Sequence, residues 1–510
     1  MNMTDTAVEQ WSLFEASFPC SGTFDNPFTE VSLEAEFFCG GSRKKVSGFY
    51  DGEGVWKIRF MPECIGEYQF RTVSNIGELN NLRGSFRAVL PEEGNHGPVR
   101  AEGGRFVYAD GTPAYICGTT VYAWWYRPDE VCGKTIASLK KYGFNKARML
   151  VFPKHLTGMD EIDLRREPPV LPFEGGKNAY DFSRPKAEYF RLLERRVAAL
   201  LEAGIQADLI LFHFYDFGMW GLDSGMSDRA AQFYLRYLLA RLGAFRNVWW
   251  SLANECDLIF ENGRARTSPD RRDWDGIGDF LRTNDPFCHL RSIHNWGPVY
   301  PNRQWMTHVS YQKQNTYSLL MQLKSLYPGK PVIAEEYEYE GNLSYGWGNL
   351  SGMQETLRHL LSFMAGGYAT HGECFVVDGN RTDLFWSYGG EIRGESAARI
   401  GYFKKIVETM PFDRMTPDLT FCDGISKFCT RCGYDVFFYL FTPECPKKDR
   451  IVTPGFDDGK RRSYRATVYD LWNMKILKEC AWEDAAIEAG GLIGVKLEQT
   501  VETAVAGTGA

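Results

Sequence analysis

The stretch VWWSLANE (248–255) is an apolar run that ends abruptly in an amide and a carboxylate, Asn254 and Glu255. An apolar run of this length is typical of a strand buried on both faces, as in a parallel sheet that helices cover. More stretches of this kind occur in the central part of the chain, at 114–122, 144–152, 206–214, 288–295, 305–312, 330–337 and 367–375. Together these stretches predict the strands of one sheet.

Segments with apolar residues at helical spacing lie between most of these strands, for example AEYFRLLERRVAALLEAG (187–204) and SGMQETLRHLLSFMAGG (351–367). No such segment is visible between 288–295 and 305–312. Strands that alternate with helices in this way predict an α/β fold, and this number of units closes a (β/α)8 TIM barrel.

The two ends of the chain have a different pattern. They alternate apolar and polar residues in short runs, such as VWKIRFMP (55–62) and YDVFFYLFT (434–442), which Gly, Asn and Asp separate. This pattern predicts antiparallel β-sandwiches. We therefore expect an N-terminal β-sandwich at 1–96, a catalytic barrel at 97–411 and a C-terminal β-sandwich at 412–510.

The composition of the chain limits the kinds of molecule that the protein is expected to bind. The 510 residues carry a net charge of −7, which argues against a nucleic-acid partner, and no apolar window is long enough to cross a membrane. The first residues lack the pattern of a secretory signal, and the 13 cysteines form no framework, so we expect reduced thiols and a cytoplasmic protein. The CTRC motif (429–432) has no second CxxC beside it, so neither a metal nor another cofactor is expected. A homo-oligomer is one possible assembly of the protein.

Polar residues gather where the predicted strands end. Catalytic side chains of TIM barrels come from the carboxyl ends of the strands. Read from the second strand to the seventh, these ends contribute Arg148, His213, Asn254, Glu255, His294, Tyr311, Gln312, Glu335 and Glu336.

Two of these carboxylates, Glu255 and Glu336, can act together in one reaction. Glu255 ends the fourth strand and Glu336 the seventh, so they can face each other across the barrel mouth, which is the arrangement that retaining glycoside hydrolysis requires. Alternation in VIAEEY places Glu336 on the face of the small Ala334, so we expect Glu336 inside and Glu335 toward the helices. Alternation cannot aim both Asn254 and Glu255 inward, and a bulge or twist would have to help.

These motifs also resemble a known family. GFNKARM, WSLANE and PVIAEEY resemble the second, fourth and seventh strands of clan A glycoside hydrolases. More narrowly, GTTVYAWW, HLRSIHNW, THVSYQ and YEGN resemble the apiosidase-like, DUF4038-type barrels. The stretch GFYDGEGVWKIRFMPECIGEY resembles the DUF5060-type sandwich that precedes such barrels, and the C-terminal part resembles a DUF5605-type domain.

The resemblance implies roles for individual residues. Glu255 would be the general acid/base and Glu336 the nucleophile. Asn254 would bind the sugar 2-hydroxyl, while Arg148 and Tyr311 would hold Glu336 ionised and oriented. Relatives often carry Asp-Glu-Cys where this chain has Glu335-Glu336-Tyr337.

The remaining candidates are contacts to an oligosaccharide or glycoside substrate. Sugars present C–H faces that pack on aromatic rings, so we expect a contribution from tryptophans near the strand ends. With the polar residues of the strand ends, the substrate-binding candidates are His213, His294, Gln312, Trp124, Trp220 and Trp296.

Long segments after the second and eighth strands, 153–183 and 376–393, favour a closed pocket and therefore an exo-acting β-glycosidase. An endo-acting glycanase, a transglycosylase and a non-catalytic carbohydrate-binding protein are the alternatives.

Overall fold

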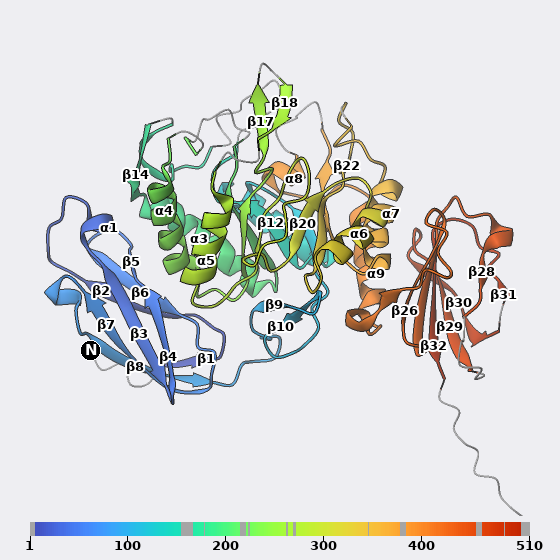
Figure 1. Cartoon of the computed structure of the whole chain (residues 1–510), viewed down its shortest axis with the longest axis horizontal. Coiled ribbons are helices and arrows are strands. Elements are labelled where there is room, and N and C mark those ends of the chain that lie inside the picture. The colour runs from blue at the N-terminus through green and yellow to red at the C-terminus, as the bar shows by residue number, and fades with distance from the viewer. Residues whose placement is uncertain are drawn as a thin grey trace, which may run out of the picture.

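The computed structural model describes residues 6–154, 167–177, 179–214, 221–222, 225–261, 264–268, 272–344, 346–377, 384–454, 462–483 and 485–500. Figure 1 shows a central body of strands and helices with a group of β-strands on either side, the N-terminal group in blue and the C-terminal group in red. None of the described helices is both long enough and apolar enough to span a membrane.

The central body is a parallel eight-stranded sheet that curls into a TIM barrel. In chain order its strands are β11 (Cys117–Thr120), β12 (Lys146–Leu150), β15 (Gln206–Phe212), β16 (Val248–Ala253), β19 (Arg291–Ser292), β20 (Val309–Gln312), β21 (Val332–Glu336) and β23 (Tyr368–His371). The order in the sheet is β19-β16-β15-β12-β11-β23-β21-β20. The ring closes between β19 and β20, where the amide of Thr307 donates to the carbonyl of Arg291 at 2.9 Å. The TIM barrel prediction is therefore confirmed.

Helices cover the outside of this sheet. They are α2 (Asp129–Tyr142), α3 (Ala187–Glu202), α4 (Asp228–Leu242), α5 (Trp274–Asn284), α6 (Ser318–Leu326), α7 (Gly352–Met364) and α9 (Ser396–Val407). Several begin at a capping side chain, and α7 has a complete capping box between Ser351 and Gln354. Residues 293–308, all of them described, form no helix, as the sequence pattern indicates.

A short hairpin closes the amino-terminal end of the barrel. It consists of β9 (Val99–Glu102) and β10 (Arg105–Tyr108). Phe106 of this hairpin is fully buried, and its ring lies 5.1 Å from that of Trp249 and 4.8 Å from that of Tyr368. Because aromatic side chains fill this end, a substrate must approach the carboxyl end of the strands.

Further elements rise around that open end (Figure 1). They are the hairpins β13 (Phe173–Gly176) with β14 (Ala179–Pro185) and β17 (Leu258–Glu261) with β18 (Arg264–Thr267), the pair β22 (Glu340–Gly341) with β24 (Glu373–Cys374), and the short helix α8 (Phe385–Tyr388).

The N-terminal part contains two sheets. One has the order β1 (Ala7–Glu9), β8 (Arg83–Val89), β7 (Gly66–Ser74), β3 (Leu33–Cys39), β4 (Ser42–Ser47), and the other β2 (Phe14–Pro19), β6 (Val55–Phe60), β5 (Phe49–Tyr50). Stacked aromatic rings fill the shared core, with centroids 4.2 Å apart for Phe14 and Phe86 and 4.0 Å for Phe37 and Phe60. The short helix α1 (Pro27–Glu30) follows β2.

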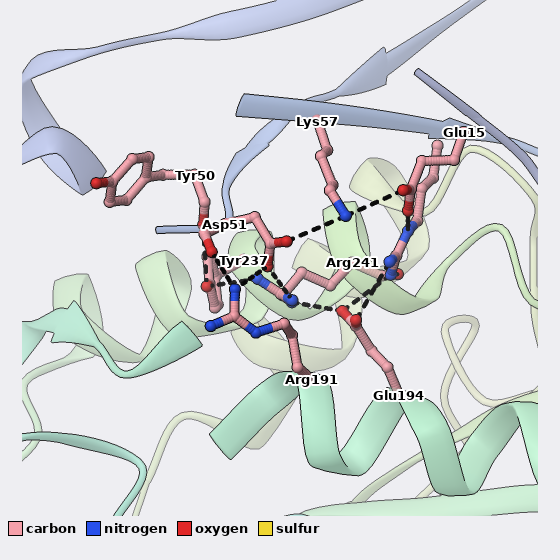
Figure 2. A network of polar contacts seen from close by, with 9 residues as sticks. Glu15, Tyr50, Asp51, Lys57, Arg191, Glu194, Tyr237 and Arg241 are labelled. Atoms are coloured by element: carbon pink, nitrogen blue, oxygen red, sulfur yellow. Dashed lines mark hydrogen bonds and ion pairs between the residues drawn. The ribbon is translucent and has the colours of Figure 1, made fainter. Parts of the chain in front are cut away.

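Buried charges join this part to the barrel (Figure 2). Arg241 of α4 has a fully buried side chain that donates to Asp51 at 2.7 Å and to Glu194 of α3. Arg59 of β6 lies 2.9 Å from Glu194 and 2.7 Å from Glu15. Because removing one partner leaves an uncompensated buried charge, such a network resists separation of the two parts.

The C-terminal part is a six-stranded sheet with a small two-stranded ribbon. The sheet order is β25 (Thr416–Pro417), β26 (Lys427–Cys432), β27 (Val436–Phe441), β32 (Ile493–Gln499), β29 (Tyr464–Asp470), β30 (Lys475–Trp482), and the ribbon pairs β28 (Ile451–Val452) with β31 (Ala485–Ala486). One face packs on the barrel, where the rings of Phe403 and Phe438 lie 5.7 Å apart. The two cysteines of the CTRC motif pack in different hydrophobic clusters. Cys429 lies in the core on the outer face of the sheet, and Cys432 packs against the cluster of the barrel.

Candidate active site

Glu336, the last residue of β21, lies at the carboxyl end of the barrel and is only 4% exposed. Its Oε1 accepts a hydrogen bond from the hydroxyl of Tyr122 at 2.8 Å and from Nη1 of Arg148 at 2.9 Å. Nε2 of His294 lies 3.4 Å from the same oxygen. The first, second, fifth and seventh strands thus all contribute to the environment of one carboxylate.

Arg148 connects Glu336 to the end of the fourth strand. Its side chain is fully buried in the barrel, and Nη1 also lies 3.1 Å from the hydroxyl of Tyr122. Nη2 donates to Oδ1 of Asn254, whose own Nδ2 lies 3.4 Å from the Tyr122 hydroxyl. Arg148, which we predicted to orient Glu336, thus contacts both Glu336 and Asn254, and its role stays a prediction.

A local backbone turn aims both Asn254 and Glu255 at the site. Strand β16 ends at Ala253, and Glu255 adopts a left-handed φ of +47°, which non-glycine residues rarely occupy. This turn interrupts the strand alternation, so that Asn254 reaches Arg148 while Glu255 hydrogen-bonds to Gln312. Backbone strain of this kind is often found at functional sites.

The two carboxyl groups have opposite electrostatic environments. Burial, followed by the negative charge of Glu336, raises the pKa of Glu255 to about 8. Burial also acts to raise the pKa of Glu336, but the positive charges of His294 in its protonated form and of Arg148, with the donating hydroxyl of Tyr122, outweigh it and lower that pKa below its ordinary value. At neutral pH the pair therefore holds one proton on Glu255 and one negative charge on Glu336.

A chain of hydrogen bonds runs from Ser310 through His294 and Gln312 to Glu255. Burial, followed by the charge of Arg148, lowers the pKa of His294 to about 4, so its imidazole is neutral. Nδ1 of His294 lies 2.8 Å from the Ser310 hydroxyl, and Nε2 lies 3.0 Å from Oε1 of Gln312. A tautomer with the proton on Nε2 donates to Gln312, whose amide is then oriented to donate to Glu255.

Glu335 contradicts the expected facing of the seventh strand. We expected it toward the helices, but it lies inside the barrel, where Lys146 donates to both its oxygens at 2.8 and 2.7 Å. Between Tyr311 and Gln312 the register of β20 against β21 shifts, so that the partner changes from Ala334 to Glu336 and Glu335 becomes the extra residue. This bulge turns both glutamates inward, so alternation alone gave a wrong side for Glu335.

Tyr311 does not hold the nucleophile candidate. Its neighbours Ser310 and Gln312 both bond to His294, so Tyr311 lies on the opposite face of β20, where its hydroxyl has no hydrogen-bond partner among the described residues. Tyr122 donates to Glu336 instead. Reading the end of the first strand, which was left out above, would have found Tyr122.

The other predicted contacts are less directly joined to the carboxylates. His213 is buried just beyond β15, and Trp124 is fully buried in the barrel core near α2. Trp296 is half-buried, and its amide donates to Asp257 at 2.7 Å. Trp220 lies outside the described residues. Their roles in substrate binding stay predictions.

A metal centre and a large cavity are the alternatives to the site at the barrel mouth. No group of three or more metal-binding side chains occurs in the described ranges of the chain. A cavity of about 1150 Å³ lies between the N-terminal sheets and α4, lined by residues such as Phe28, Lys45 and Arg236, and none of the carboxylate neighbours lines it. The barrel mouth, where Glu255 and Glu336 lie, is therefore the candidate active site.

Comparison with known proteins agrees with this geometry. Residues 7–75 match the DUF5060 domain, a domain of unknown function, and residues 101–413 match the family described as "Apiosidase-like, catalytic domain". A crystal structure of a "putative glycoside hydrolase" from Bacteroides vulgatus ATCC 8482 is 34% identical, covers 97% of this chain and 100% of its own, and has a TM-score of 0.84.

A family 5 glycoside hydrolase from the same organism is 16% identical, with a TM-score of 0.59 over 79% of this chain and 94% of its own, which shows the fold alone. No curated protein matches the chain. The DUF5605-type resemblance of the C-terminal part stays a prediction. Because the catalytic-domain match spans more than half of the sequence, we conclude that this chain is a glycoside hydrolase of the apiosidase-like family.

Proposed function

We propose that the protein is a retaining, exo-acting β-glycosidase in which Glu255 is the general acid/base and Glu336 the nucleophile. The observation that carries this proposal is the opposite shift of their two pKa values, raised to about 8 for Glu255 and lowered for Glu336. Two adjacent carboxyl groups kept in different protonation states are what double displacement needs.

The first step follows from these protonation states. Glu336 attacks the anomeric carbon of the terminal sugar while Glu255 gives its proton to the departing glycosidic oxygen, so that the C–O bond breaks and a glycosyl ester forms on Glu336. The contacts of Tyr122 and Arg148 fall on Oε1 of Glu336, so we expect Oε2 to attack.

The second step reverses these roles. Glu255, now ionised, takes a proton from water as that water attacks the anomeric carbon and releases Glu336. In both steps the amide of Asn254, which Arg148 holds through Oδ1, donates to the sugar 2-hydroxyl.

The proposal of exo action depends on the elements that surround the site. The hairpin β17–β18 rises above the carboxyl end of the barrel (Figure 1), which favours a pocket over an open groove. The segments 153–183 and 376–393, from which exo action was predicted, lie partly outside the described residues. Product analysis on a defined oligosaccharide tests this part, because single terminal sugars support exo action and internal fragments contradict it.

The decisive experiment is mass spectrometry of the protein after incubation with activated 2-deoxy-2-fluoro glycosides, followed by peptide mapping. We expect a glycosyl adduct on Glu336. An adduct on Glu335 or Glu338 would keep the double displacement but reject the assigned nucleophile. Inversion of anomeric configuration in the first-formed product would reject the retaining mechanism itself.

A further inference from the structure

The cavity of about 1150 Å³ between the N-terminal sheets and α4 has two walls that hydrogen bonds join. Nδ2 of Asn26, which precedes α1, donates to the hydroxyl of Ser183 on β14 at 3.0 Å. Nζ of Lys44 on β4 donates to the carbonyl of Pro286, which follows α5, at 2.7 Å. Ser183 and Pro286 both line the cavity, so these bonds fix its two walls to each other.

The polar network of Figure 2 also borders the cavity. Arg59 lines it and binds Glu194 at 2.9 Å. The hydroxyl of Tyr237 on α4 donates to the carbonyl of Tyr50 at 3.2 Å, which connects the barrel to the N-terminal part (Figure 2). Because these contacts hold the walls in place, a ligand that enters the cavity loses little free energy to ordering of the protein.

Half-buried aromatic rings stand on both walls of the cavity. Phe28 of α1 packs against Tyr50 and Tyr237, with ring centroids 5.0 and 5.7 Å apart. Phe233 of α4 lines the cavity from the side of the barrel. Rings of this kind offer surfaces on which the C–H faces of sugars can pack.

Two arginines of α4 give the cavity a positive charge. Arg229 and Arg236 line it, are exposed, and have no hydrogen bond or ion pair with a described residue. The guanidinium of Arg236 lies 5.4 Å from the ring centroid of Phe280, which leaves its hydrogen-bond donors available. Among the described residues that line the cavity, Glu34 is the one carboxylate, and it pairs with Lys45 at 2.6 Å. The charge of the cavity therefore suits an anion.

The spacing of these side chains suits a chain of sugars. Arg229 and Arg236 are seven residues apart, so they lie on one face of α4, about 10.5 Å apart along its axis. Gln232 and Phe233 lie between them on that face. The volume also exceeds the range of about 300–1,000 Å³ that is usual for one small ligand. An oligosaccharide with acidic groups on more than one unit can contact both arginines.

We propose that this cavity is a second binding site, which takes an acidic oligosaccharide. Carboxylates of the ligand bind Arg229 and Arg236, and its sugar faces pack on the aromatic rings of the two walls. Guanidinium groups bind carboxylates through paired, charge-assisted hydrogen bonds, which a neutral sugar cannot form.

The position of the cavity relates it to the barrel mouth. Helix α4 runs antiparallel to the strands that it covers, so Ser227 at its start, which lines the cavity, lies toward the carboxyl end of the barrel. An oligosaccharide bound along α4 therefore has one end on the side of the active site. Neither Glu255 nor Glu336 lines the cavity, so this inference does not depend on the reaction that they perform.

Calorimetric titration of the full-length Glu336→Gln variant, which lacks the proposed nucleophile and so spares the ligand from hydrolysis, tests this site. The ligands are tetramers of galacturonate and of glucuronate, each against the matched tetramer of galactose or glucose. We expect at least one acidic tetramer to bind about tenfold or more tightly than its neutral counterpart. The single uronates should bind about tenfold or more weakly than that tetramer, because one sugar cannot occupy both arginines at once.

Substitutions in the same background locate the binding. Arg229→Met and Arg236→Met should each weaken binding of the acidic tetramer by about tenfold. Arg195→Met is the matched control, because Arg195 is an exposed arginine on α3 that does not line the cavity, and it should leave binding unchanged. Equal binding of acidic and neutral tetramers, no binding of either acidic tetramer, or binding that both arginine substitutions leave unchanged would each overturn the site.

Activity of otherwise natural protein separates this site from the proposed function. Arg236→Met should leave kcat/KM on 4-nitrophenyl glycosides unchanged, because these substrates carry one sugar and do not extend into the cavity. Arginine-dependent binding of a tetramer by a protein that hydrolyses no glycoside would keep this site and reject the glycosidase. Hydrolysis without arginine-dependent binding would keep the glycosidase and reject this site.

Discussion

The hydroxyl of Tyr122 lies 2.8 Å from Oε1 of Glu336, although 214 positions separate the two residues in the chain. Donation of this hydrogen bond favours the ionised form of Glu336, which is the form that can attack a sugar. Substitutions can test the contacts of the two carboxylates and the buried ion pairs that stabilise the fold.

Tyr122→Phe should lower kcat/KM by roughly 10- to 100-fold, because a hydrogen bond to a charged group contributes about 1.5–3 kcal/mol. Losing a donor to the ionised carboxylate raises the pKa of Glu336, so the acidic limb of the pH profile should move to higher pH. Tyr311→Phe is the matched control, since its hydroxyl has no partner among the described residues. Equal losses in both variants would contradict the assignment.

Glu255→Gln should remove the basic limb of the kcat/KM profile, which we expect near the pKa of about 8 of Glu255. Activity falls above this pH in the natural enzyme because the acid has lost its proton. The variant should lose roughly 10²- to 10⁴-fold on substrates with poor leaving groups and much less on 2,4-dinitrophenyl glycosides. A uniform loss across leaving groups would argue against a proton-donating role.

Glu335→Gln should destabilise the fold by about 3–5 kcal/mol at pH 7, because it removes a buried carboxylate from the ammonium of Lys146, which keeps its contact to Asp208 at 3.0 Å. Lys146 and Arg148 outweigh the effect of burial and lower the pKa of Glu335 from 4.5 to about 2. A carboxylate with a lowered pKa in the folded state stabilises above pH 4.5 and loses that contribution as pH falls toward 2. Urea unfolding at pH 7 and pH 3 should show a smaller drop for the variant than for the natural protein.

Arg241→Met should lower the stability of the N-terminal attachment by about 3–5 kcal/mol, since it leaves Asp51 and Glu194 buried with one cation fewer (Figure 2). Limited proteolysis and thermal unfolding would report the loss. Arg87→Met removes a pair with Glu67 that is 71% exposed on both sides, so it should change stability by less than about 1 kcal/mol. A similar result for both variants would mean that the buried network does not join the two parts.

Local patterns were enough for most of the barrel. Each of the eight apolar stretches contains a strand of the sheet, and the expected gap in the helices after 288–295 is present. Such strands are recognisable from sequence because burial on both faces demands continuous apolar residues. The position of Glu336 was also anticipated, but by an argument that placed Glu335 on the wrong side.

The order of strands and helices and the carboxylates at two strand ends can therefore be read from the sequence, because apolar periodicity and strand ends are local properties. Which side chains meet depends on how the strands pair and how the barrel closes. The bulge at Glu335 depends on the register between β20 and β21, and the left-handed turn at Glu255 overrides strand alternation. The choice of Tyr122 over Tyr311 follows from which strand faces point into the closed barrel, and barrel closure brings together residues that no local pattern connects.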